Sequence, residues 1–426
     1  MSSDADPSAR EAGVELLEEV GRGRRLDVAW EARAPSLGLN ERRWVQEAVF
    51  GSIRLQGRLD FLLDLHLDRG IQSVPEPLLR LLRFGAYQLL YMDSVPGYAA
   101  VSETVTLARG VGGRKGAGLV NAVLRSLGRA GAGPVRFPSF EADPAGYLST
   151  WGSHPRWLVE RWIARFGSDT ARSIVEAGNR VPGLFLRPVG RDPEAAAETL
   201  RRTGIQAEPG PEGSDTLRLA SGTDPVAALA AVPAIVQDPA AAGVVRWVRA
   251  REGEWLADLC AAPGGKGIAL AGAGARLIAS DASFSRLARV REGLRRLGLP
   301  ERLVVARGEN PPFGAVDVVL ADVPCSGTGT LARHPDARWR LAPDTPGSLA
   351  RTQSRILAGA ASLVKPGGKV VYATCTLEKE ENEGVVEAFL SDNPGFIGDD
   401  EGRFFRVLPG DWGTDGAFAA SLRRIG

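Results

Sequence analysis

Two cysteines occupy equivalent places in the last part of this 426-residue sequence. Cys325 follows an apolar run at 316–321 and an Asp-Val-Pro turn, and Cys375 directly follows a second such run at 369–374. Apolar runs of this length predict buried parallel strands, and open α/β sheets place their active sites at the carboxyl ends of these strands. A single cysteine there is usually a small apolar filler. Two cysteines, each in a polar turn, favour a catalytic role over a packing role.

A pair of thiols beside a carboxylate suits covalent catalysis on a pyrimidine ring. The thiolate is the reactive form of cysteine, and a covalent intermediate divides one difficult step into easier ones. When a thiolate adds to C6 of a cytosine, C5 becomes enamine-like and able to accept a methyl group. The C5 proton must then leave before the thiol is released. Asp322, which precedes Cys325 in the same turn, would hydrogen-bond the N3/N4 edge of the base.

A glycine-rich turn follows the predicted strand at 254–259, within the segment Asp258-Leu-Cys-Ala-Ala-Pro-Gly-Gly-Lys266. In this place of a doubly wound sheet, such a turn lets the backbone approach a nucleotide-like ligand closely. Its spacing fits neither the P-loop nor GxGxxG, and a tight strand–helix turn without a ligand is the alternative. The predicted cofactor-binding residues of this segment are Cys260, Ala261, Ala262, Pro263, Gly264, Gly265 and Lys266.

Acidic residues follow the next two predicted strands. Asp281 ends the strand at 276–280, where an acid can hold both hydroxyls of a ribose. The alternative role for Asp281 is an N-cap of the helix that follows. Glu309 follows the strand at 302–306 and could accept a hydrogen bond from an adenine amine, although an exposed loop acid is nearly as good an interpretation.

The basic residues are mostly arginine, with only five lysines among 52. Arginine suits phosphate contacts and base stacking, but a GC-rich genome that encodes arginine everywhere is the preferred explanation of the bias. The net charge is +1, so only local clusters indicate a nucleic-acid partner. No acid lies between Glu103 and Glu141, and this stretch is either a phosphate-binding face or a solvated helix face. Its basic residues are Arg109, Arg114, Lys115, Arg125, Arg129 and Arg136.

The composition indicates a globular cytoplasmic protein with reduced thiols. Hydrophobic residues make up 44% and charged residues 24% of the chain, and no apolar run approaches the roughly 18 residues of a membrane span. The N-terminal stretch is acidic and polar, unlike an export signal. The three cysteines, which include Cys260, have spacings that suit neither zinc nor a CxxC redox centre. No metal is therefore expected.

The hydrophobic pattern divides the chain into three predicted domains. Residues 1–135 have apolar residues at helical spacing, and 136–228 combine aromatic helices with short strands in a small α+β domain. Residues 229–426 alternate strand and helix, which predicts an α/β domain with a parallel sheet covered on both faces. Its predicted strands are 254–259, 276–280, 302–306, 316–321 and 369–374, and its predicted helices are 284–297, 347–363 and 380–391.

The C-terminal motifs resemble those of the Sun/RsmB family of RNA cytosine-C5 methyltransferases. The matching segments are DLCAAPGGK (258–266), ADVPCSGTGTLARHPDARW (321–339) and YATCTLEKEENEGVV (372–386), together with Asp281. The N-terminal third is similar to a NusB-type helical RNA-binding domain. It shares GSIR (51–54), LRFGAYQL (82–89), VPGYAAV (95–101) and VNAVLR (120–125).

The resemblance implies an all-α NusB-like domain, a small α+β domain and a class I (Rossmann-like) methyltransferase domain. It implies S-adenosylmethionine as cofactor and a cytosine of 16S ribosomal RNA as substrate, with no membrane or metal partner and a monomeric enzyme. Cys375 would attack the base and Cys325 would be needed for product release. A transfer RNA methyltransferase and a non-catalytic RNA-binding ribosome-assembly factor are the alternatives.

Two positions depart from the family pattern. Gly267 stands where the glycine-rich motif usually continues with Thr, and Glu309 stands where an Asp usually follows the third strand. Neither change removes a reacting group, so we expect an active enzyme.

Overall fold

The computed structural model describes residues 7–133, 136–399 and 404–425, which form two compact units. The first, the helical unit, extends to Arg180 and also includes Leu331–Arg340. The second, the sheet unit, contains Val181–Thr330 and the chain from Leu341 onward. These units do not follow the predicted boundaries at 135 and 228, and the boundary at 135 lies outside the described residues. The three-domain division stays a prediction.

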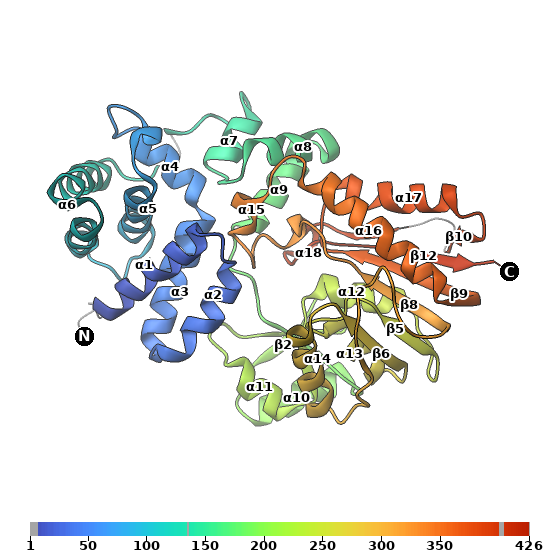
Figure 1. Cartoon of the computed structure of the whole chain (residues 1–426). Helices are drawn as coiled ribbons and strands as arrows, with labels where there is room; N and C mark the ends of the chain where they lie inside the picture. The colour runs from blue at the N-terminus through green and yellow to red at the C-terminus, as the bar shows by residue number, and fades with distance from the viewer. Residues whose placement is uncertain (1–6, 134–135, 400–403, 426) are drawn as a thin grey trace. The chain divides into compact units, whose positions relative to one another are not determined.

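The helical unit confirms the helical pattern of the N-terminal third (Figure 1). Its helices are α1 (Pro7–Gly21), α2 (Leu26–Arg33), α3 (Leu39–Arg54), α4 (Gln56–Asp64), α5 (Glu76–Tyr91), α6 (Gly97–Ala130), α7 (Pro144–Thr150), α8 (Arg156–Phe166), α9 (Ser168–Gly178) and α15 (Ala337–Arg340). Single 3₁₀ turns lie at Ala34–Ser36 and Ile71–Ser73. Helix α6 consists of two helical halves, because the backbone leaves the helical conformation at Gly113, where φ is +61°.

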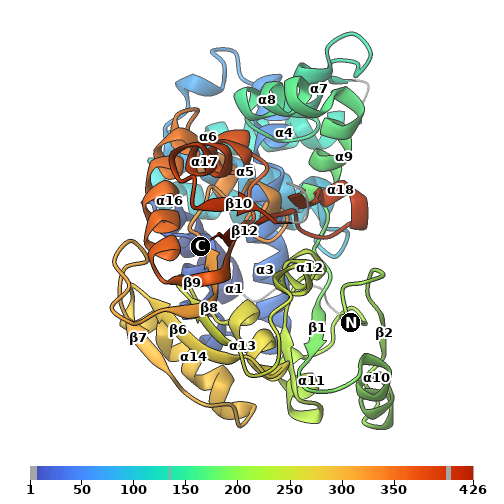
Figure 2. The ribbon, with the colours of Figure 1, turned by 90° about the vertical axis from the view of Figure 1, so that its right-hand side faces the viewer.

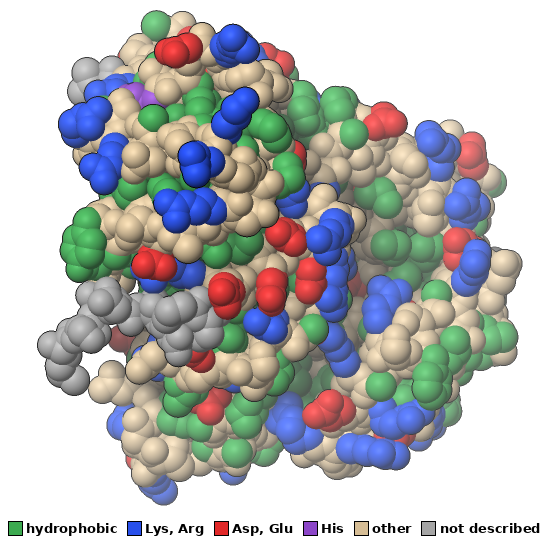
Figure 3. All heavy atoms as spheres, turned by 60° about the vertical axis from the view of Figure 1, so that its left-hand side comes forward, with side chains coloured by type: hydrophobic (Ala, Val, Ile, Leu, Met, Phe, Trp, Pro, Cys, Tyr) green, Lys and Arg blue, Asp and Glu red, His purple; other side chains and the backbone are tan. Residues whose placement is uncertain are grey.

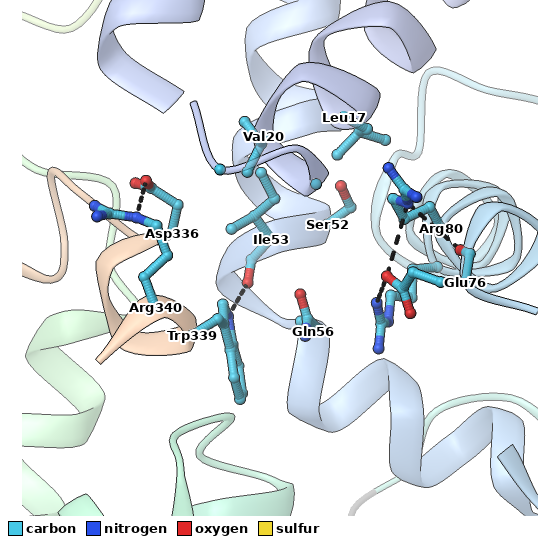
Figure 4. A pocket seen from close by; sticks show the side chains of 13 residues that line it. Leu17, Val20, Ser52, Ile53, Gln56, Glu76, Arg80, Asp336, Trp339 and Arg340 are labelled. Atoms are coloured by element: carbon cyan, nitrogen blue, oxygen red, sulfur yellow. Dashed lines mark hydrogen bonds and ion pairs between the residues drawn. The ribbon is translucent and has the colours of Figure 1, made fainter. Parts of the chain in front are cut away.

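The segment Leu331–Arg340 belongs to this unit although it lies far along the chain. Arg338 is fully buried, and its guanidinium donates hydrogen bonds to the carbonyl oxygens of Ser153 and Gly178. The indole nitrogen of Trp339 donates to the carbonyl oxygen of Ile53 at 2.8 Å (Figure 4). Because a buried guanidinium is costly unless its donors are satisfied, these bonds fix the segment within the helical unit. The HPDARW part of the family motif therefore packs here.

The sheet unit contains an eight-stranded sheet in the order β10-β12-β9-β8-β5-β6-β7, with β11 paired to β12. Strands β5 to β9 pair in parallel, whereas β12 runs antiparallel to β9, β10 and β11. The predicted parallel sheet is thus confirmed, with an antiparallel edge that the sequence patterns did not predict. The strands are β5 (Trp255–Asp258), β6 (Arg276–Asp281), β7 (Leu303–Val305), β8 (Val316–Asp322), β9 (Val364–Thr374), β10 (Phe396–Gly398), β11 (Phe404–Val407) and β12 (Ala417–Arg424).

Helices cover both faces of this sheet (Figure 1). Val244, Ile268 and Leu287 of α12, α13 and α14 pack on one face. Leu357 and Val385 of α16 and α17 pack on the other face. Central strands buried on both faces must be almost wholly apolar, which is why their runs were readable in the sequence. The helices are α12 (Pro239–Val248), α13 (Gly265–Gly272), α14 (Phe284–Arg296), α16 (Thr345–Ser362), α17 (Glu383–Asp392) and α18 (Pro409–Trp412), with 3₁₀ turns at Thr328–Thr330 and Lys379–Glu381.

A smaller antiparallel sheet, in the order β2-β3-β1-β4, carries two helices of its own (Figure 2). Three helices of the sheet unit begin with an Asp-Pro pair, at Asp192, Asp224 and Asp238, and each aspartate accepts a backbone N–H of the first turn. Asp is a preferred N-cap and Pro a preferred first helical residue. The elements are β1 (Phe185–Pro188), α10 (Pro193–Arg202), β2 (Ala207–Pro209), β3 (Leu217–Leu219), α11 (Pro225–Ala231) and β4 (Ala234–Val236).

No helix in the described parts of the chain is both long enough and apolar enough to cross a membrane.

Candidate active site

The two cysteines lie side by side at the carboxyl ends of β8 and β9. Their sulfur atoms are 3.3 Å apart, and the backbone N–H of Cys375 points at the sulfur of Cys325 at 3.4 Å. The hydrogen bond to Cys375 and burial together raise the pKa of the Cys325 thiol. Cys325 therefore stays protonated near neutral pH. The sheet topology brings together two residues that are 50 positions apart in the sequence.

A buried carboxylate, Glu381, connects the two cysteine loops. Its side chain accepts hydrogen bonds from the backbone N–H of Ser326 at 2.8 Å, from the Ser326 hydroxyl and from the Thr376 hydroxyl at 3.1 Å. Gln353 of α16 donates a further bond at 2.8 Å. Ser326 and Thr376 each follow one of the cysteines, so Glu381 fixes both loops at once. Its burial raises its pKa, and the bonds from Ser326 oppose this shift.

The position of Glu381 corrects the predicted helix over 380–391. Helix α17 begins at Glu383, and Glu381 ends a separate 3₁₀ turn with a fully buried side chain. An acid near a helix start satisfies the helix dipole in either case. The sequence therefore held no signal that separates a solvated acid from a structural one.

Lys266 and Asp322 form an ion pair beside the cysteines. The ammonium nitrogen of Lys266 lies 2.6 Å from a carboxylate oxygen of Asp322. Burial lowers the pKa of Lys266, but the charge and hydrogen bond of Asp322 outweigh it, with a smaller contribution from Cys375, so the pKa is raised overall. A cation close to a cysteine is a typical environment of a thiolate nucleophile. The pair joins the glycine-rich turn to the end of β8, three residues before Cys325.

The glycine-rich turn connects β5 to α13 with little room for side chains. Gly264 has a φ of +112°, a conformation that glycine adopts without strain. At Gly267, a Cβ atom would lie 2.7 Å from a carboxylate oxygen of Asp258. The family's usual Thr would therefore require Asp258 to move, which gives Gly267 a packing reason. Asp258 is itself buried, and this burial raises its pKa to about 8.

Cys260 differs chemically from the other two cysteines. Burial and the nearby carboxylates of Asp258, Asp322 and Asp281 raise the pKa of its thiol. A protonated thiol in this half-buried position packs as a small apolar side chain. Ala261, Ala262 and Pro263 follow it in the turn, and the backbone N–H of Ala261 bonds to the carbonyl oxygen of Ser280.

Asp281 ends β6 directly opposite this turn. One of its oxygens accepts the backbone N–H of Ala262 at 3.3 Å. The other accepts the N–H of Ser283 at 2.9 Å and a guanidinium nitrogen of Arg286 at 2.7 Å. The N-cap of α14 is Ser283 and not Asp281, since the Ser283 hydroxyl accepts the N–H of Arg286. Asp281 is 2% exposed but Arg286 is 60% exposed, so the arginine can yield this oxygen to a ligand hydroxyl.

Glu309 lies in the loop after β7, near the same turn. A Cβ atom on its neighbour Gly308 would lie 3.6 Å from the sulfur of Cys260, so this loop borders the glycine-rich turn. The Glu309 carboxylate is half-buried. The loops after β5, β6 and β7 thus meet at one edge of the sheet.

Several buried polar atoms around the turn have no partner in the protein. They include both side-chain polar atoms of Gln237, one carboxylate oxygen of Asp258 and the hydroxyl of Ser280. A Cβ atom on Gly265 would lie 3.3 Å from the amide nitrogen of Gln237, so this amide borders the turn. Native buried polar groups are almost always paired. These atoms fit a polar ligand at the turn, and Gln237 is a residue that the sequence patterns did not single out.

The described residues contain no group of His, Cys, Asp and Glu side chains arranged to hold a metal ion. The site therefore consists of a glycine-rich turn with unpaired polar atoms, an ion pair, and two thiols in contact.

Three family models match the chain. The model described as 16S rRNA methyltransferase RsmB/F matches residues 245–423, the NusB family model matches 7–129, and an RsmF/B-like ferredoxin-like domain matches 154–225. A probable ribosomal RNA small subunit methyltransferase B of Bacillus subtilis is 33% identical and covers 92% of this chain and 93% of its own length. The corresponding protein of Cronobacter sakazakii is 32% identical and covers 97% and 98%.

A crystal structure of PH0851 has the same fold. It covers 98% of this chain and 99% of its own, with a TM-score of 0.78 and 22% identity. The helical N-terminal part, the small sheet and the large mixed sheet thus occur together in another protein.

Proposed function

Because this chain belongs to the ribosomal RNA small subunit methyltransferase B family, we propose that it methylates C5 of a cytosine in 16S ribosomal RNA with S-adenosylmethionine as methyl donor. The observation that supports this most strongly is the contact between two sulfur atoms at the ends of neighbouring strands, 3.3 Å apart. A non-catalytic RNA-binding protein would have no need to keep two thiols in a buried polar frame.

The nucleophile in this proposal is Cys375. Its thiolate adds to C6 of the cytosine, the ring electrons move toward C5, and N3 takes up a proton from water. Asp322 lies beside it and would hydrogen-bond the N3/N4 edge of the base, while the Lys266 ammonium balances the charge of Asp322 at 2.6 Å. Covalent addition of this kind converts an unreactive aromatic carbon into a nucleophile.

Cys325 serves the release step. After methylation, a base removes the C5 proton and the electrons of the C5–H bond form the C5–C6 double bond. The C6–sulfur bond breaks with its electron pair returning to Cys375, and N3 gives up its proton, which restores the aromatic ring. Cys325 is the titratable group in contact with the attacking sulfur, and its raised pKa keeps a proton on it at the start of the cycle. While protonated, Cys325 does not compete as the nucleophile. Because its hydrogen bond with Cys375 is the largest cause of the raised pKa, the bond of Cys375 to C6 removes this cause, and Cys325 can then give its proton to water and take the C5 proton as a thiolate.

The residues around the glycine-rich turn suit the methyl donor, which supplies an electrophilic methyl group when bound. Asp281 would hold the ribose hydroxyls, Glu309 the adenine amine, and the turn from Cys260 to Lys266 the rest of the molecule. The unpaired polar atoms of Gln237 and Asp258 beside this turn support a polar ligand there. We infer a cytoplasmic enzyme, since its substrate is ribosomal RNA, and its monomeric state stays a prediction.

The test uses 16S ribosomal RNA from a strain that lacks this gene. The purified protein with S-adenosylmethionine should produce 5-methylcytosine at one position, detected by bisulfite sequencing, and the Cys375→Ser variant should produce none. Transfer RNA from the same strain is the second substrate. Methylation of transfer RNA alone would refute the substrate assignment, and no methylation of either RNA would favour a non-catalytic protein.

A further inference from the structure

The two halves of α6 border a groove of about 650 Å³ on the helical unit. Its floor is apolar and includes Leu89 of α5 together with Val101 and Leu124 of α6. Gly97 and Gly128 flank Leu89 so closely that a Cβ atom on either would lie 3.2–3.3 Å from its side chain. The absence of side chains at these two positions lets Leu89 lie between the two halves of the helix.

The rim of this groove carries arginines and an exposed aromatic ring. Arg109 lies on the first half of α6, and Arg125 and Arg129 lie one turn apart on the second half. Tyr98, at the start of the helix, is 75% exposed. Tyr98 and Arg109 are eleven residues apart, which corresponds to about 16 Å along a helix. The rim is thus long enough for several consecutive contacts to an extended chain.

The three rim arginines have no acidic partner among the residues that the structure describes. The side chain of Arg125 donates only to Asn121 within its own helix. Figure 3 turns this unit toward the viewer, and Lys and Arg side chains gather in the upper left of the view with few acidic side chains between them. Unpaired arginines around a concave surface create a positive potential that attracts an anion.

A second hollow of the same unit, of about 310 Å³, shows the opposite arrangement (Figure 4). There Arg340 pairs with Asp336 at 3.0 Å, and Arg80 and Arg83 both pair with Glu76. Those guanidinium charges are already balanced by carboxylates. The three arginines of the α6 groove differ from these in having no such carboxylate partner in the described parts of the chain.

We propose that the α6 groove binds a single-stranded segment of the RNA substrate. Arg109, Arg125 and Arg129 contact its phosphates, and Tyr98 stacks on one unpaired base. Single-stranded nucleic acid is bound in this way by positive grooves with exposed aromatic side chains. An aromatic ring on the rim can stack only on a base that is free of a double helix, so the geometry selects single strands. This inference rests on the proposed function, because it takes RNA as the substrate.

The polar side chains between the arginines suit RNA in particular. Ser102, Thr106 and Asn121 line the same groove. Hydroxyl and amide groups can bond to ribose 2′-hydroxyls, which distinguish RNA from DNA. The groove thus combines the three contacts of single-stranded RNA binding: charge, stacking and hydroxyl recognition.

The first experiment compares two triple variants of the full-length protein by fluorescence anisotropy with a labelled single-stranded RNA of about 12 nucleotides. In the test variant, Arg109, Arg125 and Arg129 are changed to Gln. In the matched control, Arg43, Arg69 and Arg180 of the same unit are changed to Gln; these exposed residues lie outside the groove, so the control removes the same charge elsewhere. We expect the test variant to lose at least about tenfold in affinity and to lower the salt slope of binding by about 2. Equal affinity and slope for both variants would overturn the proposal.

The second experiment tests the stacking contact. Tyr98→Ala should weaken binding of the single strand by about tenfold with an unchanged salt slope, and Tyr98→Phe should restore it. The same RNA annealed to its complement should bind more weakly to the wild-type protein and should not respond to Tyr98→Ala. Equal binding of both forms, or an equal loss for both, would exclude a site for single strands.

Methylation kinetics separate this inference from the proposed function. On 16S ribosomal RNA, the Arg109/Arg125/Arg129 variant should raise KM for RNA while kcat and the affinity for S-adenosylmethionine stay unchanged. If the wild-type protein methylates RNA but this variant shows the KM of the control, the groove assignment fails and the proposed function stands. If the wild-type protein binds the oligonucleotide through the groove but methylates nothing, the proposed function fails and the groove assignment stands.

Discussion

The two cysteine loops and the α6 groove use polar residues in opposite ways. Around the cysteines, polar groups pair with one another: Glu381 alone accepts bonds from Ser326, Thr376 and Gln353. Around the groove, Arg109 and Arg129 remain without an acidic partner within the described chain. One region is a closed hydrogen-bond network, and the other is an open charged surface.

The two proposed functions account for this difference. A covalent step needs two sulfur atoms held within a fraction of an ångström, which a satisfied buried network provides. A flexible RNA strand instead needs charges that can adapt to its phosphates, which exposed arginines provide. Changes in the first region should therefore affect rates, and changes in the second should affect RNA affinity.

The largest effect on turnover is expected at the cysteines, and the two Cys→Ser variants should differ in their results. Cys375→Ser should reduce turnover by at least about 10³-fold and form no covalent adduct, because a serine hydroxyl is barely ionised near neutral pH. Cys325→Ser should still attack and methylate the base but fail to release it. A denaturing gel after incubation with RNA and S-adenosylmethionine should show a shifted protein–RNA band for Cys325→Ser.

The same gel can also contradict this assignment of roles. A shifted band with Cys375→Ser and none with Cys325→Ser would mean that the two roles are exchanged. A shift in neither variant would contradict covalent catalysis.

The next effect tests whether the buried network controls rate. Glu381→Ala should lower kcat by about 10²-fold, since a small misplacement of reacting groups costs this much. The affinity for S-adenosylmethionine, measured by calorimetry, should hardly change, and Glu381→Gln should recover part of the rate. Glu387→Gln on the exposed side of α17 is the matched control and should behave as wild type. A Glu381 variant that binds RNA less well but turns over normally would contradict a role of the buried network in the rate.

A smaller effect is expected at the cofactor side of the sheet unit. Asp281→Ala should weaken the binding of S-adenosylmethionine by about 1.5–3 kcal/mol, the range for a hydrogen bond to a charged group. Ser283→Ala is the control, because it removes the N-cap of α14 and should cost about 1 kcal/mol of stability without altering cofactor affinity. Isothermal titration calorimetry measures both variants. Unchanged affinity in a folded Asp281→Ala protein would remove this residue from the site.

The last prediction concerns the pH dependence of stability and a single buried acid, and it involves the smallest expected effect on catalysis. Burial raises the pKa of Asp258 to about 8, so the native protein holds this proton more tightly than the unfolded chain does. The resulting stabilisation is complete below the ordinary pKa of an aspartate and is lost as the pH rises through about 8. Asp258→Asn should therefore flatten the fall of the urea midpoint between pH 5 and pH 8. A variant with the wild-type slope would show that Asp258 is ionised throughout this range.

The sequence predicted the central sheet well because its strands are buried on both faces. The apolar runs ending at Asp258, Asp281 and Asp322 could be placed within one or two residues. The antiparallel strand β12 was missed because its run, Ala417–Arg424, mixes small and charged residues without a clear period. The acid of the cysteine network, Glu381, was missed because burial leaves no mark on an isolated glutamate in a sequence.

Long-range packing set a second limit. The motif ending in Trp339 was read as one functional segment, yet its last part packs with residues around Arg54 and Ser153. Arg338 lies 284 residues from Arg54, and no local pattern can reveal such a pairing. The α6 groove could be predicted in part. Its basic stretch was visible in the sequence, but the kink at Gly113 that brings its two halves together was not.

The placement of Leu331–Arg340 in the helical unit determines how this protein can be divided into fragments that fold. Because these ten residues fill the interior of one unit while their neighbours on both sides belong to the other, the chain passes between the units three times, at 180–181, 330–331 and 340–341. A gene fragment that ends at residue 180 would leave a hole where Arg338 belongs, and a fragment that begins there would expose the buried Arg338 and the half-buried Trp339 to water. Chimaeras that exchange helical units between relatives should therefore transfer this short segment together with the N-terminal region, because the two separate stretches of sequence form one structural unit.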